Sequence, residues 1–280
     1  MAGRVRGRPR YSATVYCFLG AGRAHVWYLE CAVVLRICGL FTARYSQRSV
    51  RLLPSKMLTI AIDGPAGAGK STVSKMLARR LGLALVDTGA LYRSIALKAG
   101  RQGVGMEDEV ALGALATSLN IRFAFEGDVN RVFVDGDDVT DFIRTPEVAH
   151  SASKIAAWPA VRSGLLSLQR QLAAQVPGAV LEGRDIGTVV LPHASAKFFL
   201  TAPIRTRVQR RFDELVGSGG SPDWESLLAT EIERDRRDSE RAVAPLKQAE
   251  DALLVDSSEL SAAGVVDRMV EHIRSAGEGL

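Results

Sequence analysis

The sequence predicts an α/β fold in which a five-stranded parallel sheet is flanked by helices. Three observations lead to this prediction. Apolar, β-rich runs alternate with helical periods from Met57 onward, acidic residues follow several of these runs, and a glycine-rich loop joins the first run to a helix. Strands of a parallel sheet are buried on both faces and therefore read as short apolar runs. The predicted strands are Leu58–Ile62, Leu83–Val86, Ala179–Leu181, Lys197–Leu200 and Ala252–Val255.

The first predicted strand leads into a complete G-x4-G-K-S phosphate loop, followed by a predicted helix over Thr72–Leu81. The glycines let successive backbone N–H groups face an anion, and the helix N-terminus adds partial positive charge. We expect Lys70 to reach the β and γ phosphates of a nucleoside triphosphate, and the Ser71 hydroxyl to bind Mg²⁺ together with waters. A glycine-rich turn without a ligand is the alternative. The predicted triphosphate-binding residues are Gly64, Pro65, Ala66, Gly67, Ala68, Gly69, Lys70, Ser71 and Thr72.

The second, third and fifth predicted strands each run directly into an acidic residue, namely Asp87, Glu182 and Asp256. In open α/β sheets the carboxyl ends of the strands form the edge where ligands bind. Asp87 and Glu182 are therefore candidate site residues. The alternative for each is an ordinary turn former or helix N-cap.

About ninety residues separate the second and third predicted strands, too many for a simple crossover connection. Their centre, Ile121–Glu126 and Arg131–Val134, alternates apolar and polar residues around Gly127-Asp128 and predicts an antiparallel hairpin. The expected flanking helices are Glu107–Leu119, Pro146–Ala157 and Ala160–Gln175. Such a folded insertion can close a second substrate against the first and exclude water from a transfer reaction.

Arginines are placed where phosphates would lie. Arg93 falls in the first turns of a predicted helix, where the helix dipole opposes a cation unless an anion is nearby, and Arg184 follows the third predicted strand. Further along the chain, Arg234, Asp238 and Arg241 follow i, i+4, i+7 spacing and are expected to share one helix face. That face could hold a phosphate and accept a hydrogen bond from an exocyclic amine. A solvated, salt-bridged helix is the alternative.

Composition sets the first 56 residues apart. They carry nine Arg and one Lys against a single acidic residue, whereas the remaining 224 residues carry 26 basic and 30 acidic side chains. The total charge of +5 therefore gives no reason to expect nucleic acid or membrane as a partner of the phosphate-loop region. All three cysteines also lie in residues 1–56, and the four histidines show no metal-ligand spacing.

Three explanations of residues 1–56 remain open. Met57 directly precedes the first strand, so the natural protein is expected to begin there; in that case the extension is disordered or not part of it. An Arg-rich targeting peptide and a structured function are the alternatives.

Five motifs resemble the bacterial cytidylate kinase family, in the right order over essentially all of residues 57–280: Asp63–Thr72, Asp87–Arg93, Ile143–Ala149, Glu182–Thr188 and Arg234–Pro245. The resemblance implies transfer of the γ-phosphoryl group of ATP to CMP or dCMP with Mg²⁺, in a cytoplasmic monomer that acts on small molecules. It also implies a phosphate-loop kinase core over 57–90 and 179–280, an inserted nucleoside-monophosphate-binding domain at about 91–178 and a short helical lid at about 205–241. Another phosphate-loop kinase, of the UMP or shikimate type, is the alternative, and a GTP-driven switch is disfavoured because its base-reading motif is absent.

The resemblance assigns roles residue by residue. Ser153, Arg234 and Asp238 would lie near the cytosine and Arg162 would also contact the nucleotide, while Thr88 and Asp185 would face the sugar. The implied catalytic residues are Lys70, Arg93, Arg184, Asp185 and Arg241. The implied substrate-binding residues are Asp87, Thr88, Arg93, Ser153, Arg162, Arg184, Asp185, Arg234, Asp238 and Arg241. Some members of the family have Ser, Asp and Gly at the positions of Thr88, Glu182 and Ser71. The last difference leaves open how important the Ser71 hydroxyl is for Mg²⁺.

Overall fold

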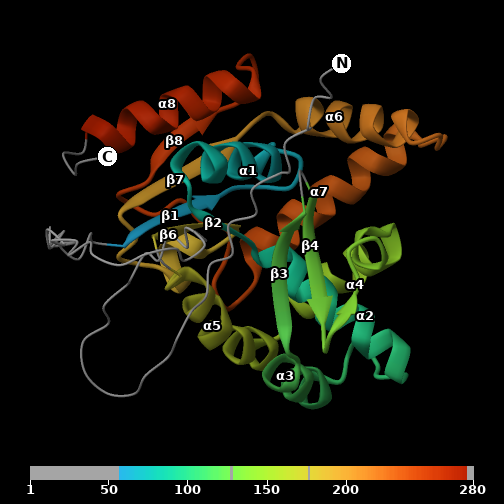
Figure 1. Cartoon of the computed structure of the whole chain (residues 1–280). Helices are drawn as coiled ribbons and strands as arrows, with labels where there is room; N and C mark the ends of the chain where they lie inside the picture. Colours follow the sequence, from blue (N-terminus) through green and yellow to red (C-terminus); the bar gives the residue numbers. More distant parts are fainter. Residues whose placement is uncertain (1–56, 127–128, 176, 276–280) are drawn as a thin grey trace, which may run out of the picture. The chain divides into compact units, whose positions relative to one another are not determined.

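The computed structural model describes residues 57–126, 129–175 and 177–275 (Figure 1). The expectations about residues 1–56 and about the turn at Gly127-Asp128 therefore lie outside the described residues. A five-stranded sheet has the order β2-β6-β1-β7-β8, and every neighbouring pair is parallel, which confirms the predicted fold class. Its strands are β1 (Leu58–Asp63), β2 (Ala84–Asp87), β6 (Gly178–Gly183), β7 (Ala196–Thr201) and β8 (Leu253–Asp256).

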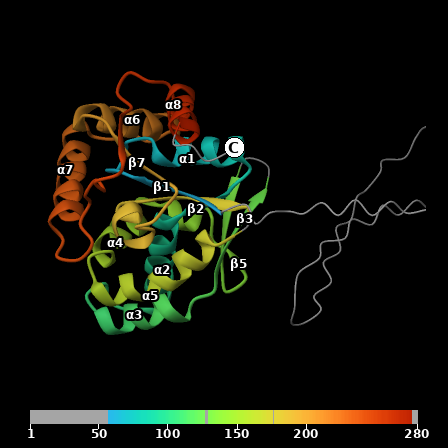
Figure 2. The ribbon, with the colours of Figure 1, turned by 90° about the vertical axis from the view of Figure 1, so that its left-hand side faces the viewer.

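Both faces of this sheet are covered by helices (Figure 2). The helices α1 (Lys70–Leu81) and α8 (Ala262–Ser275) pack on one face, where Phe198 and Leu77 are fully buried. On the other face, Leu181 packs against the C-terminal part of α5 (Pro159–Ala173) and against the π-helical turn η2 (Ile186–Val190). Burial on both sides explains why the strands read as continuous apolar runs.

Two further helices form a hairpin between β7 and β8. They are α6 (Ile204–Gly217) and α7 (Trp224–Glu240), and the rings of Phe212 and Trp224 meet edge to face at a centroid distance of 5.9 Å. Of the residues in α7, only Asp238 is buried. The hairpin occupies the segment expected to be the lid, although its movement stays a prediction.

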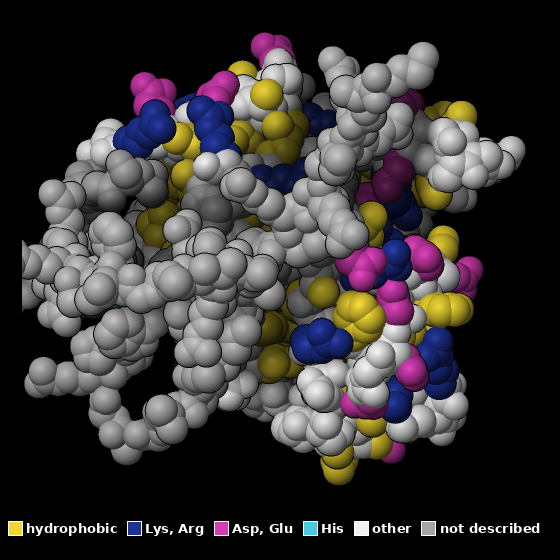
Figure 3. Space-filling model, in the orientation of Figure 1, with side chains coloured by type: hydrophobic (Ala, Val, Ile, Leu, Met, Phe, Trp, Pro, Cys, Tyr) yellow, Lys and Arg dark blue, Asp and Glu magenta, His cyan; other side chains and the backbone are white. Residues whose placement is uncertain are grey.

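The described surface is mixed in charge on the face that Figure 3 shows, where basic and acidic side chains lie next to one another. Within the described ranges, no helix combines the length and the apolar character that a bilayer span requires.

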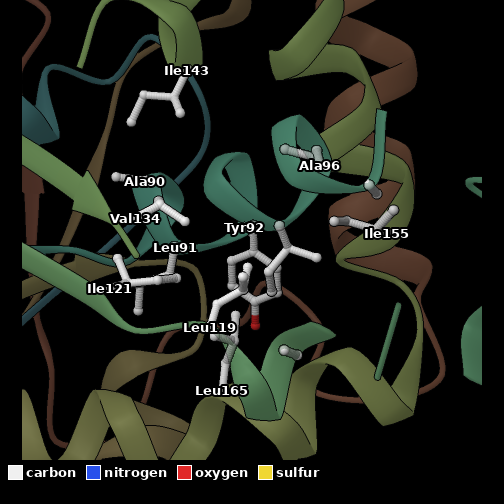
Figure 4. Packing of buried hydrophobic residues seen from close by; sticks show 14 of the residues in the cluster. Ala90, Leu91, Tyr92, Ala96, Leu119, Ile121, Val134, Ile143, Ile155 and Leu165 are labelled. Atoms are coloured by element: carbon white, nitrogen blue, oxygen red, sulfur yellow. The ribbon is translucent and has the colours of Figure 1, made fainter. Parts of the chain in front are cut away.

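The insertion after β2 has its own apolar core (Figure 4). It contains α2 (Thr88–Gln102), α3 (Glu109–Ser118), the turn η1 (Phe142–Arg144) and α4 (Pro146–Ile155), around an antiparallel sheet of β3 (Ile121–Glu126), β4 (Val129–Val134) and β5 (Asp137–Asp138). Leu91, Leu112, Ile155 and Leu165 are fully buried in this core. The predicted small antiparallel sheet is confirmed, with a third strand too short to be recognised from its pattern.

Helix α5 packs both in the core of the insertion and under the main sheet. The first half of α5 contributes Val161 and Leu165 to the core of the insertion, and Ala173 at its end packs under the main sheet. The helix therefore carries the chain from the insertion back across the sheet to β6.

Helix ends differ from the expectations by a few residues. The phosphate-loop helix begins at Lys70 rather than Thr72, α3 is shorter than Glu107–Leu119, and α4 ends at Ile155. The last helix of the insertion spans Pro159–Ala173 instead of Ala160–Gln175.

Candidate active site

The phosphate loop lies at the carboxyl end of β1 and leads directly into α1. Its three glycines at 64, 67 and 69 have φ values of 148°, 72° and 90°. A Cβ atom on Gly64 would lie 2.0 Å from the carbonyl oxygen of Leu200, so only glycine fits there. Of the nine predicted triphosphate-binding residues, the first six form the loop between β1 and α1 and the last three the first turn of α1, where an anion is favoured.

The side chain of Lys70 forms a hydrogen bond within its own loop. Its Nζ atom donates a hydrogen bond to the carbonyl oxygen of Pro65 at 2.6 Å. Burial, followed by the positive charges of Arg184 and, more weakly, Arg234, lowers the pKa of Lys70 well below its usual value. The positive charges of Arg184 and Arg234 thus act on Lys70, an arrangement that a polyphosphate would stabilise.

The Ser71 hydroxyl donates a hydrogen bond to Oε2 of Glu182 at 3.0 Å. Burial, together with the neighbouring charge of Asp87, raises the pKa of Glu182 to about 7. Asp87 and Glu182 are register partners at the ends of β2 and β6, so the two acidic residues lie at one edge, as predicted.

The Ser71 hydroxyl and the Glu182 carboxylate form a pair of hard oxygen donors. In the described part of the chain, no group of three or more His, Cys, Asp or Glu side chains could hold a metal ion. Mg²⁺ does not need such a group, because it usually keeps several waters and takes one or two protein oxygens plus the phosphates of its nucleotide. The residues present therefore fit Mg²⁺.

Asp87 has two tasks at the start of α2. Its Oδ1 accepts a hydrogen bond from the backbone N–H of Ala90 and thereby caps the helix, and its Oδ2 accepts one from Arg93 at 2.6 Å. The anion expected near Arg93 is thus supplied in part by the protein itself. Thr88 is buried, and its hydroxyl donates to the carbonyl oxygen of Glu182 at 2.7 Å.

Asp238 is held by an arginine from another element than expected. Its Oδ2 accepts a hydrogen bond from Nε of Arg184 at 2.8 Å. Burial opposes ionisation of Asp238, but Arg184, Arg234 and Arg241 together lower its pKa. The expectation that Arg241 shares the helix face is wrong in one respect: α7 ends at Glu240, and Arg241 is its C-cap with an extended backbone, φ −60° and ψ 140°.

Asp185 lies between two guanidinium groups. It forms a short ion pair with Arg162, and its Oδ1 lies 3.5 Å from Nη2 of Arg241. All three side chains are less than a tenth exposed. The Arg162 guanidinium also lies over the ring of Tyr92, 5.7 Å from its centroid. The structure thus joins three predicted residues and adds Tyr92 beneath them.

Ser153 contacts an arginine that sequence reasoning did not select. Nη1 of Arg237 donates to its hydroxyl at 3.0 Å, which links α4 to α7. Arg237 lies in the charge-dense run of α7. Nothing in the spacing of that run distinguishes it from the neighbouring arginines.

Asp63 was also missed as a site residue. Its Oδ1 and Oδ2 accept hydrogen bonds from the backbone N–H groups of Ile186 and Gly187 at 2.8 and 2.7 Å, which ties β1 to the segment after Arg184. Burial raises the pKa of Asp63 to about 6. The sequence carries a signal for this residue, because Asp63 directly follows the first predicted strand just as Asp87 follows the second.

Several buried polar atoms in this region have no hydrogen-bond partner among the described residues. They include Nε of Arg93, Nε of Arg234 and the Tyr92 hydroxyl. A buried donor without a partner costs free energy, so arginines of this kind fit a ligand that brings acceptor oxygens.

Comparisons with known proteins show which family the chain resembles. A family model described as cytidylate kinase matches residues 60–275. The cytidylate kinase of Pseudomonas paraeruginosa is 49% identical over 220 residues, which cover 78% of this chain and 96% of the relative. The cytidylate kinase of an Exiguobacterium species is 45% identical over 223 residues, or 79% of this chain and 99% of the relative. A crystal structure of a gluconokinase from Sinorhizobium meliloti, 15% identical, covers 79% of this chain and 94% of its own with a TM-score of 0.42.

Proposed function

The chain belongs to the cytidylate kinase family, and from this premise we propose that it transfers the γ-phosphoryl group of ATP to CMP or dCMP, giving CDP or dCDP. One observation carries the assignment to this site: Lys70 is buried in the phosphate loop, and the partly buried Arg184 and Arg234 lie near enough for their charges to act on it. A site of this charge suits two nucleotides whose phosphates must come close together.

The transfer needs no general base. The accepting phosphate oxygen is already an anion at neutral pH, and the difficulty lies in bringing two like-charged phosphates in line. Positioning and neutralisation of charge therefore supply the catalysis. Lys70 and the loop N–H groups would bind the donor, while Arg93, Arg184 and Arg241 would stabilise the transferring group.

On the acceptor side, Ser153, Arg162, Arg234 and Asp238 would bind the pyrimidine nucleotide. Asp185 holds Arg162 and Arg241 by ion pairs, so it would orient both guanidinium groups besides facing the sugar together with Thr88. The buried network holds two arginines and one aspartate, so an anion such as a phosphate would balance its remaining positive charge.

Mg²⁺ would be held by Ser71 together with waters, and Glu182 accepts the hydrogen bond of that serine. When bound, the ion neutralises charge on the β and γ phosphates. Asp87 would not face the ion directly, because its two carboxylate oxygens already bond Ala90 and Arg93.

Family membership does not favour the UMP-kinase or shikimate-kinase alternative. We also propose that the enzyme acts as a cytoplasmic monomer on small molecules, with neither nucleic acid nor membrane as a partner. In support, one chain supplies the residues implied for both donor and acceptor.

The full chain should be assayed by coupled ADP release with ATP and Mg²⁺ against CMP, dCMP, UMP, AMP, GMP and shikimate. We expect ADP release that depends on CMP or dCMP, with CDP or dCDP detected chromatographically. Lys70→Ala should lower kcat by at least about a hundredfold, as expected for loss of one transition-state charge partner, whereas Lys75→Ala on the same helix should not. Activity only with another acceptor, or unchanged turnover in Lys70→Ala, would refute the proposal.

A further inference from the structure

A buried arginine on α6 touches the phosphate loop without belonging to it. The Arg207 side chain is 6% exposed. Its Nη1 donates to the carbonyl oxygen of Ala66 at 3.0 Å, and its Nε donates to that of Ala202 at 2.9 Å. The guanidinium thus holds one carbonyl of the loop and one carbonyl beyond the end of β7.

The same guanidinium pairs with Asp235 on α7. Nη2 lies 2.6 Å from Oδ2 and Nη1 lies 3.3 Å from Oδ1, so the contact is bidentate. Asp235 directly follows Arg234 and lies three residues before Asp238, the residues assigned to the acceptor nucleotide. One side chain therefore connects the donor loop to the helix that carries acceptor contacts.

The backbone of α6 is also fitted to the loop. A Cβ atom on Gly67 would lie 2.9 Å from Cβ and 3.1 Å from the carbonyl oxygen of Arg207. Two successive loop carbonyls are held by cations, that of Pro65 by Lys70 and that of Ala66 by Arg207. A change in the path of the loop on binding a triphosphate would therefore move a hydrogen-bond acceptor of Arg207.

We propose that Arg207 and Asp235 are a positioning pair that couples the phosphate loop to α7, so that binding of ATP favours the placement of Arg234 and Asp238 that holds the acceptor in line. The inference rests on the proposed function, since it assigns one nucleotide to each end of the pair. No contact with a substrate is assigned to the pair; Arg207 acts through Ala66 on one side, and Asp235 acts through α7 on the other.

The geometry requires arginine. Three acceptors in different directions are satisfied by one planar guanidinium, whereas a lysine ammonium on a flexible stem cannot reach all of them at once. Arg207→Lys therefore keeps the charge but breaks the connection, and Asp235→Asn breaks it from the other helix.

The test is the mutual effect of two ligands, measured by calorimetry on the full chain. The dissociation constant of CMP is measured with and without a saturating non-hydrolysable ATP analogue and Mg²⁺, in the wild type, Arg207→Lys, Asp235→Asn and the double variant. We expect a wild-type coupling factor of roughly 5 to 150 that falls towards 1 in each variant. The coupling factor of the double variant should be no lower than that of the single variants, because both substitutions break the same connection. Turnover should fall by about tenfold or more, since small misplacements of reacting groups are costly.

Matched controls come from exposed ion pairs on the same helices. Arg211→Lys on α6 disturbs the pair with Glu214, and Glu240→Gln on α7 disturbs the pair with Arg236. Both should keep the wild-type coupling factor. A merely structural role of Arg207 would lower the melting temperature and leave the coupling factor unchanged.

An unchanged coupling factor in Asp235→Asn, or a wild type in which the two ligands do not affect each other, would overturn the proposal. If Arg207→Lys does not fold, Asp235→Asn decides the question alone. Absence of CMP phosphorylation in the wild type would instead contradict the proposed function, so the two failures are distinguishable.

Discussion

Asp238 is buried on α7 and bonded to Arg184, a residue 54 positions away in the sequence. Its pKa is lowered by three arginines despite burial, so it is ionised at neutral pH. An ionised carboxylate only accepts hydrogen bonds. Cytosine offers an amine donor at C4 where uracil offers a carbonyl acceptor, so the charge state of this one residue can select the base.

We expect Asp238→Ala to lower kcat/KM for CMP far more than for UMP. A desolvated group left unpaired costs roughly 1 to 3 kcal/mol, so the CMP-to-UMP ratio should narrow by about tenfold or more. The KM for ATP should stay close to that of the wild type. Steady-state kinetics with both acceptors measure this, and Glu240→Gln at the exposed end of the helix is the control. An unchanged ratio would remove Asp238 from base recognition.

Asp63 should make stability depend on pH. Burial raises its pKa from 3.8 to about 6, so between these values the folded state binds more protons than the unfolded state. The stabilisation that Asp63 contributes to the folded state is therefore full below pH 3.8 and is lost as the pH rises through 6. The free energy of unfolding of the wild type relative to Asp63→Asn should fall by on the order of 3 kcal/mol between pH 4 and 7.

Urea unfolding of the wild type and Asp63→Asn across this pH range measures the difference between their free energies of unfolding. The other titrating groups contribute equally to both proteins and cancel in this difference. Loss of one backbone hydrogen bond in Asp63→Asn adds an offset that does not vary with pH. Parallel curves for the two proteins would show that Asp63 keeps an ordinary pKa.

At the scale of the elements, α5 contributes to three regions of the described structure. It contributes to the core of the insertion at Leu165, to the cluster beneath the main sheet at Ala173, and to the site at Arg162. Packing at one end of this helix therefore supports chemistry at the other.

Leu165→Ala should lower the free energy of unfolding by about 2 to 5 kcal/mol, the usual cost of truncating a fully buried leucine. Val110→Ala on α3, whose side chain is mostly exposed, should change it by less than about 0.5 kcal/mol. Chemical denaturation of the two variants provides the comparison. A loss below about 1 kcal/mol in Leu165→Ala would mean that the insertion core is loosely packed.

The strands were predictable because each is a continuous apolar run, and the phosphate loop because its glycines and lysine have fixed spacing. The strand β5 was not, since two residues carry no periodicity. The end of α7 was misjudged by one residue at Arg241, because a sequence pattern does not mark where a helix ends in an extended cap.

The predicted site residues were largely chosen through a family resemblance, and the structure brings most of them to one edge of the sheet. Their partners could not be read from the chain. The pairs Arg184 with Asp238 and Arg207 with Asp235 join different helices and loops, and only the folded topology makes them neighbours. Burial, which decides the pKa values of Asp63 and Glu182, is likewise a property of the fold.

For the molecule as a whole, charge divides the chain at Met57. Residues 57–280 carry 26 basic and 30 acidic side chains, and the family match spans residues 60–275. We predict that a protein of residues 57–280 folds and phosphorylates CMP as the full chain does. Thermal melting and the coupled assay on both proteins measure this. If the shorter protein is insoluble or inactive, residues 1–56 contribute to the folded enzyme.

Because α5 packs both in the insertion and under the main sheet, a movement at one end of this helix would displace its other end. Fifteen residues of helix span about 22 Å, so a rotation of only about 5° around the end near Ala173 moves the other end by roughly 2 Å. Arg162 sits near that moving end. A larger side chain at Ala173, which packs in the cluster under the main sheet, should therefore shift Arg162 and change the affinity for the acceptor nucleotide.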